Sequence, residues 1–119
     1  MSELKVNGEG VEPIYELEDS AMRVPLSPPL PPGEQIVIQL AFTVEVPTSE
    51  GGNYGTFAFL DEVLALAHFY PMIAVYDDEG WNVEIAPQIG DVIYADSSFY
   101  LVRVTAPAEP TLVTSGLEI

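Results

Sequence analysis

Residues 69–91, FYPMIAVYDDEGWNVEIAPQIGD, decide the fold that this sequence predicts. Two largely apolar segments, residues 72–76 and 81–85, flank the acidic tetrapeptide Asp77-Asp78-Glu79-Gly80. Asp and Gly tolerate the backbone angles of tight turns, so this order is typical of a β-hairpin. We therefore predict a hairpin in which Trp81, the only tryptophan, is a buried aromatic anchor, followed by a second turn at Gly90-Asp91.

Apolar and polar residues alternate in several further segments, which predicts strands on both sides of this hairpin. The clearest is residues 34–46, where the even positions form an apolar face for the core: Ile36, Ile38, Leu40, Phe42, Val44 and Val46. Other strands are expected at residues 11–17, 21–26, 54–60, 91–94, 98–106 and 111–116. Residues 61–68 have a helix-favouring composition, and we favour a strand there because strands are expected on both sides.

Short strands separated by turns, without alternating helices, indicate an all-β fold. The arrangement that fits best is an antiparallel β-sandwich of about seven to eight short strands. A chain of 119 residues fits one domain, residues 1–119, in which about two thirds of the unfolded surface can be buried.

The charge is strongly negative, with 3 Lys and Arg against 19 Asp and Glu, a formal net charge of −16. Such a surface repels polyanions, so nucleic acid and anionic membranes are not expected partners. The sequence has no apolar run long enough for a membrane helix and no signal peptide at its start, which predicts a soluble chain of unknown localisation. The absence of cysteine excludes disulfides, a thiol nucleophile and a cysteine-ligated zinc site.

Residues with possible catalytic or metal-binding chemistry are few. His68 is the only histidine and no G-x-S-x-G motif accompanies it, so we interpret it as a core or edge residue. Paired carboxylates are so abundant that none stands out as a general acid and base. Residues 77–80 could bind calcium through oxygen ligands, but the ligand spacing of an EF-hand is absent, and a hairpin turn is the simpler interpretation.

Aromatic side chains could form a carbohydrate-binding platform, although aromatics at alternate strand positions more often fill a core. The candidates are Tyr70, Tyr76, Trp81, Tyr94 and Tyr100.

The order of these signals resembles the second half of the N-terminal β-domain of zinc aminopeptidases of the aminopeptidase N type, which are gluzincin metallopeptidases. The resemblance covers nearly the whole chain. The segments that carry it are Leu30-Pro-Pro-Gly33-Glu34, Val46-Pro47, Tyr54-Gly55, Phe69-Tyr70-Pro71, Tyr76, Gly80-Trp81, Gly90-Asp91, Tyr100-x-Val102-x-Val104-x-x-Pro107 and Val113-Thr-Ser-Gly116.

The resemblance implies a non-catalytic domain that packs on a zinc-containing catalytic domain and helps to cover its active-site cleft. The motifs that carry the family's chemistry, H-E-x-x-H and G-x-M-E-N, do not occur here, and neither does the A-R segment that contacts the substrate amino group. We therefore expect no catalytic, cofactor-binding or metal-binding residue in this chain. It is expected to be a fragment of a larger metallopeptidase, whose missing catalytic domain is its partner and holds the zinc. The alternative is a free-standing β-sandwich that binds carbohydrate or calcium.

Overall fold

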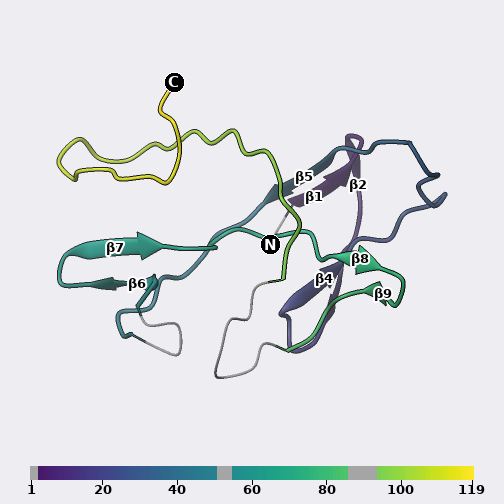
Figure 1. The fold of residues 1–119 in the computed structure, drawn as a ribbon, viewed down its shortest axis with the longest axis horizontal. Coiled ribbons are helices and arrows are strands. Elements are labelled where there is room, and N and C mark those ends of the chain that lie inside the picture. The colour runs from purple at the N-terminus through teal and green to yellow at the C-terminus, as the bar shows by residue number, and fades with distance from the viewer. Residues whose placement is uncertain (1–2, 51–54, 86–93) are drawn as a thin grey trace.

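The computed structural model describes residues 3–50, 55–85 and 94–119. These residues contain nine strands and no helix, which confirms the all-β class (Figure 1). The strands are β1 (Glu3–Val6), β2 (Glu9–Gly10), β3 (Ile14–Glu16), β4 (Ala21–Arg23), β5 (Ile38–Ala41), β6 (Phe57–Leu60), β7 (Val63–Leu66), β8 (Tyr76–Asp77) and β9 (Gly80–Trp81). They form one three-stranded sheet and three two-stranded sheets, all antiparallel. Contacts between strands lie almost wholly within these sheets, so a sandwich stays a prediction.

The three-stranded sheet has the order β2-β1-β5 and joins the start of the chain to residues more than thirty positions away. Leu4 pairs with Leu40 and is buried. Asn7 extends the ladder by one step, because its N–H donates to the Val37 carbonyl at 2.8 Å and its Oδ1 accepts the Val37 N–H at 2.9 Å. The sequence analysis missed β1, although its residues Glu3-Leu-Lys-Val6 alternate; four residues is the shortest alternation that indicates a strand.

Strands β3 and β4 lie within residues 11–17 and 21–26, where strands are expected, and they form a hairpin across the loop of residues 17–20. Leu17, Glu18 and Asp19 all have positive φ, and Ser20 closes the loop by donating from its N–H and its Oγ to the Leu17 carbonyl, at 3.1 and 2.6 Å. Arg23 pairs with Glu16 across the two strands at 2.7 Å.

Strands β6 and β7 form another hairpin. The strand expected over residues 61–68 is confirmed at Val63–Leu66, but Asp61 and Glu62 form the turn instead of part of the strand. Asp61 and Glu62 connect them, with φ of 48° and 65°. Positive φ at both central residues is the signature of the type I′ turn, whose twist matches that of the flanking strands. Ala58 is buried, while most of the large apolar side chains of the hairpin are exposed.

Several predicted strands are wrong in extent or absent. Within residues 34–46 only Ile38–Ala41 forms a strand. Residues 72–75 are not a strand, and residues 98–106 and 111–116 contain none. Alternating apolar and polar residues show that a segment can lie in a sheet. A strand forms only where a neighbouring segment supplies partners for its backbone hydrogen bonds. The turn at Gly90-Asp91 and most of the strand expected at residues 91–94 lie outside the described residues.

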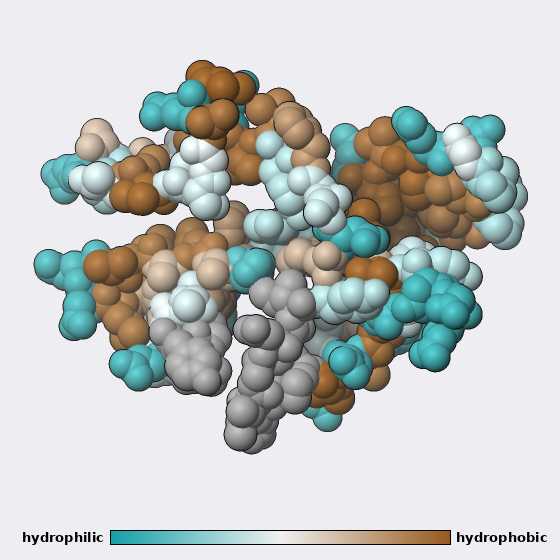
Figure 2. Space-filling view, viewed as in Figure 1, coloured by the Kyte–Doolittle hydropathy of each residue, from teal (hydrophilic) through white to brown (hydrophobic). Residues whose placement is uncertain are grey.

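The molecule is open. Its radius of gyration is 16.7 Å, against about 13.5 Å for a compact domain of this length. Leu4, Ala58 and Val75 are the apolar residues that the described part of the chain buries. Apolar side chains therefore reach the surface at many places (Figure 2).

Leu4 is expected to stabilise the three-stranded sheet, because its side chain is only 4% exposed. Replacing it, Leu4→Ala, should lower the free energy of unfolding by about 2 kcal/mol, through lost apolar burial and the cavity left behind. Urea denaturation followed by circular dichroism measures the change. The matched control is Leu117→Ala, at a side chain 96% exposed; an equal loss in both variants would contradict a core at Leu4.

Candidate functional site

The hairpin of β8 and β9 carries an exposed pair of aromatic side chains. Tyr76 and Trp81 are directly opposite one another in the register, and their ring centroids lie 4.9 Å apart at an interplanar angle of 67°. Trp81 is 62% exposed and Tyr76 66% exposed. The prediction that Trp81 is a buried anchor is therefore wrong. The pair still stabilises the hairpin, since cross-strand aromatic contacts contribute beyond area burial.

Asn82 fastens the base of this hairpin. Its backbone N–H donates to the Val75 carbonyl at 2.8 Å, and its side-chain amide donates to the same carbonyl at 3.2 Å and to Asp77 Oδ2 at 2.8 Å. The sequence analysis missed this residue. The signal that could have found it is an amide placed five residues after an aspartate across a predicted turn.

Asp77 uses both carboxylate oxygens inside the hairpin. Oδ1 accepts the backbone N–H of Glu79 at 2.9 Å, the arrangement of an Asx turn, while Oδ2 accepts the Asn82 amide. The Asn82 hydrogen bond, and then the Glu79 N–H, lower the pKa of Asp77, because both donors favour the charged carboxylate. Gly80, at φ 109°, completes the turn. The hairpin-turn interpretation of residues 77–80 is confirmed.

A second aromatic group joins two segments that are thirty residues apart. Tyr70 and Tyr100 have centroids 5.5 Å apart, and Phe69 meets the Tyr70 ring edge-on at 5.4 Å. A hydrogen bond to Tyr100 raises the pKa of Tyr70. Within residues 3–50, 55–85 and 94–119, no ring contact connects this group to Tyr76 and Trp81 or includes Tyr94. The five candidate platform residues are thus spread over separate places.

His68 lies just after β7, exposed, with a left-handed backbone φ of 52°. Its ring makes no hydrogen bond or ion pair with any described residue. Because it is exposed, it lies at an edge and not in the core. In the part of the chain that the structure describes, no three or more His, Asp or Glu residues gather closely enough to hold a metal ion.

The outer face of the three-stranded sheet carries a shallow hollow of about 190 Å³, lined by Glu3, Lys5, Gln39, Leu40 and Ala41. Small-molecule sites in proteins usually exceed about 300 Å³. Lys5 is also paired with Glu3 at 2.5 Å, so its charge is already neutralised locally. The exposed Tyr76–Trp81 pair is therefore the stronger candidate for contact with a ligand.

Comparison with known proteins finds no family model, no curated protein and no solved structure that matches this chain. Among the described residues there is no helix with the length and apolar character needed to cross a membrane.

The Asn82 amide is expected to control the ionisation of Asp77. In Asn82→Ala the pKa of Asp77 should rise towards its ordinary value, because the largest cause of its lowering is gone. With wild-type Asn82, the folded state gains stability above the unfolded-state pKa of Asp77 and loses it as the pH falls through the lowered folded value. Side-chain carboxyl NMR titration measures this pKa. Gln35→Ala, an exposed position on another part of the chain, is the control and should leave it unchanged.

Proposed function

We propose that this chain is a non-catalytic accessory β-domain of a zinc metallopeptidase of the aminopeptidase N type. In this proposal it packs on the catalytic domain and shields its cleft. The ordered set of motifs described above supports the family, and the observation that carries the proposal is the amount of apolar surface left uncovered.

The accessible surface of the chain is 11,077 Å², against about 6,300 Å² for a compact monomer of its mass. The excess is greatest towards the end of the chain, where every described residue from Tyr94 onwards is exposed. Apolar side chains dominate this exposed set: Phe99, Leu101, Val102, Leu112, Val113, Leu117 and Ile119. Many uncovered large apolar side chains in one segment are typical of a protein interface, since water contact with them is unfavourable.

The contact between Tyr70 and Tyr100 fits the same proposal. Tyr70 belongs to the F-Y-P segment and Tyr100 begins the Y-x-V-x-V segment, so two motifs of the resemblance meet in space. Their meeting supports a single folded unit that spans both motifs.

The proposal assigns different roles to the accessory domain and the catalytic domain. This chain has one histidine and no cysteine, and in this proposal the zinc and the peptide-cleaving groups belong to the catalytic domain. The accessory domain would contribute surface, exclusion of water and restriction of access to the cleft.

The proposal predicts that the isolated chain binds no stoichiometric zinc and hydrolyses no aminoacyl substrate, and that its gene continues into a region encoding H-E-x-x-H. Elemental analysis of the purified chain, an aminopeptidase assay and the flanking coding sequence test these points. Turnover by the isolated chain, or an open reading frame that encodes no metallopeptidase domain, would refute it.

The exposed pair of Tyr76 and Trp81 favours a second candidate, a free-standing module that binds carbohydrate. Sugar rings stack on exposed aromatic faces in many proteins, and 62% exposure leaves the indole accessible. The interplanar angle of 67° means that the two rings do not form one flat platform, so a sugar would stack on one ring at a time.

This second candidate predicts a higher melting midpoint in the presence of one member of a glycan panel, because a ligand that binds only the folded state stabilises it. Trp81→Ala should abolish that shift, whereas Tyr94→Ala, at an equally exposed tyrosine, should keep it. Calcium is tested in the same assay. If neither glycans nor calcium move the midpoint, the ligand-binding module is rejected.

A further inference from the structure

The β6–β7 hairpin presents a free sheet edge along β7. The N–H of Phe59 donates to the Pro47 carbonyl, outside the hairpin, whereas Ala67 N–H donates to Thr56, across it. In an antiparallel pair the outward and inward backbone groups alternate, so Leu64, opposite Phe59, and Leu66 turn their N–H and C=O groups away from β6. No strand of the described chain pairs with that side of β7.

The same chain contains a strand-forming segment without a partner. Residues 98–106, SFYLVRVTA, alternate as a strand does, yet they are not part of any sheet. Phe99 is 94% exposed and Leu101 77%. The ring contact with Tyr70 holds Tyr100, and thereby the segment, in place. Residues 98–102 carry no charge and no proline, the composition of segments that add to exposed sheet edges.

We propose that residues 99–103 of one copy of this chain pair antiparallel with β7 of a second copy, so that two copies form a twofold dimer. The register that aligns Arg103 with Glu62 places Val102 opposite Val63, Leu101 opposite Leu64, Tyr100 opposite Ala65 and Phe99 opposite Leu66. Leu64 and Leu66, whose backbone groups point outward, then exchange hydrogen bonds with Leu101 and Phe99.

Side-chain chemistry fits this register on both faces. Phe57, Phe59, Leu64 and Leu66 share one face of the hairpin, because they are cross-strand partners in its register. Phe99 and Leu101 extend that apolar face by one strand, while Tyr100 and Val102 fall on the face of Val63 and Ala65.

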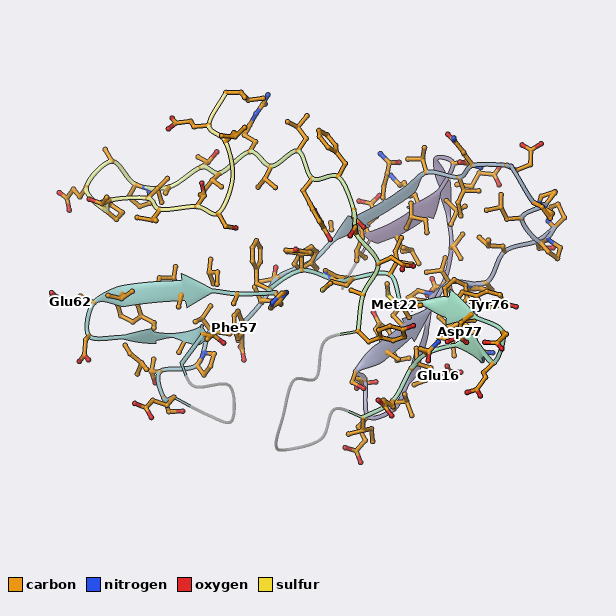
Figure 3. All side chains as sticks on the ribbon, in the orientation of Figure 1. Glu16, Met22, Phe57, Glu62, Tyr76 and Asp77 are labelled. Carbon is orange, nitrogen blue, oxygen red and sulfur yellow. The ribbon has the colours of Figure 1, made fainter. Side chains whose placement is uncertain are left out.

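Charge selects the same register. Lys5 pairs with Glu3 and Arg23 with Glu16, which leaves Arg103 as the one cation among the described residues without an ion pair. Glu62 projects from the tip of the β6–β7 hairpin, at the end of the molecule remote from Tyr76 and Asp77 (Figure 3). Antiparallel pairing brings these two opposite charges together at the fifth aligned position.

A second copy is the partner because each chain supplies both halves of the interface, the edge and the strand. In a twofold dimer the two halves are used reciprocally, which closes the assembly. The interface uses residues 57–66 and 99–103. Of the exposed apolar residues named under the proposed function, Phe99, Leu101 and Val102 therefore face the second copy, and Leu112, Val113, Leu117 and Ile119 are the ones that stay free for the catalytic domain. Each copy has a net charge of −16, so repulsion opposes association and salt should strengthen it.

Charge reversal tests the register. Glu62→Arg alone and Arg103→Glu alone each place like charges at both contacts of a homodimer, and each should raise the dimer dissociation constant about tenfold. An equimolar mixture of the two variants restores opposite charges at both contacts and should recover the wild-type dissociation constant. Analytical ultracentrifugation over a concentration series, at about 50 and about 500 mM NaCl, measures it.

Glu109→Arg is the matched control, since it makes the same charge change at an exposed position outside the interface; it should not weaken the dimer. Leu64→Lys should abolish association, because a charge would be buried in the apolar face. A wild-type chain that stays monomeric throughout, or single variants that lose stability and are not rescued by mixing, would overturn the proposal. The second result would assign the pairing of Glu62 and Arg103 to one chain.

Discussion

Backbone pairing between neighbouring strands is the constraint on which this structure depends. A strand satisfies only half of its N–H and C=O groups with each neighbour, and an isolated two-stranded hairpin is marginal in water without further packing. Three of the four sheets in the described part of the chain are such hairpins. The exception, β2-β1-β5, owes its third strand to pairing between the start of the chain and residues 38–41, and it contains Leu4, one of three buried apolar residues in the described part.

Local hydrogen bonds compensate in part for the small core. The β3–β4 loop is closed by Ser20, the β6–β7 turn by the backbone angles of Asp61 and Glu62, and the β8–β9 hairpin by Asp77 and Asn82. Each of these devices acts within a few residues of sequence, so each stabilises its own hairpin locally. They do not cover the apolar side chains between the hairpins, and that uncovered surface connects the fold to both proposals. A domain partner would cover part of it, and pairing with another copy would satisfy the free edge of β7.

Acidic charge sets a limit on these contacts. The chain has nineteen acidic residues and exposes much apolar surface. Its negative charge makes copies of the chain repel one another. In the proposed dimer, the opposite charges of Arg103 and Glu62 would offset part of this repulsion. Arg103 matters in the proposed dimer because it has no ion pair with any acidic residue in the described chain.

Sequence alone determined the all-β class and the β8–β9 hairpin, because Asp77 and Gly80 specify a reversal of the chain within a few residues. The sequence did not predict the turn at Asp61-Glu62, since residues 61–68 were expected to form one strand. Tertiary structure alone decided which alternating segments have partners: residues 38–41 pair with β1, residues 98–106 pair with nothing in the described chain, and Trp81 lies on the surface. The physical reason is that alternation specifies two faces of a strand, whereas burial and pairing depend on a second segment that is distant in sequence and leaves no mark in the local pattern.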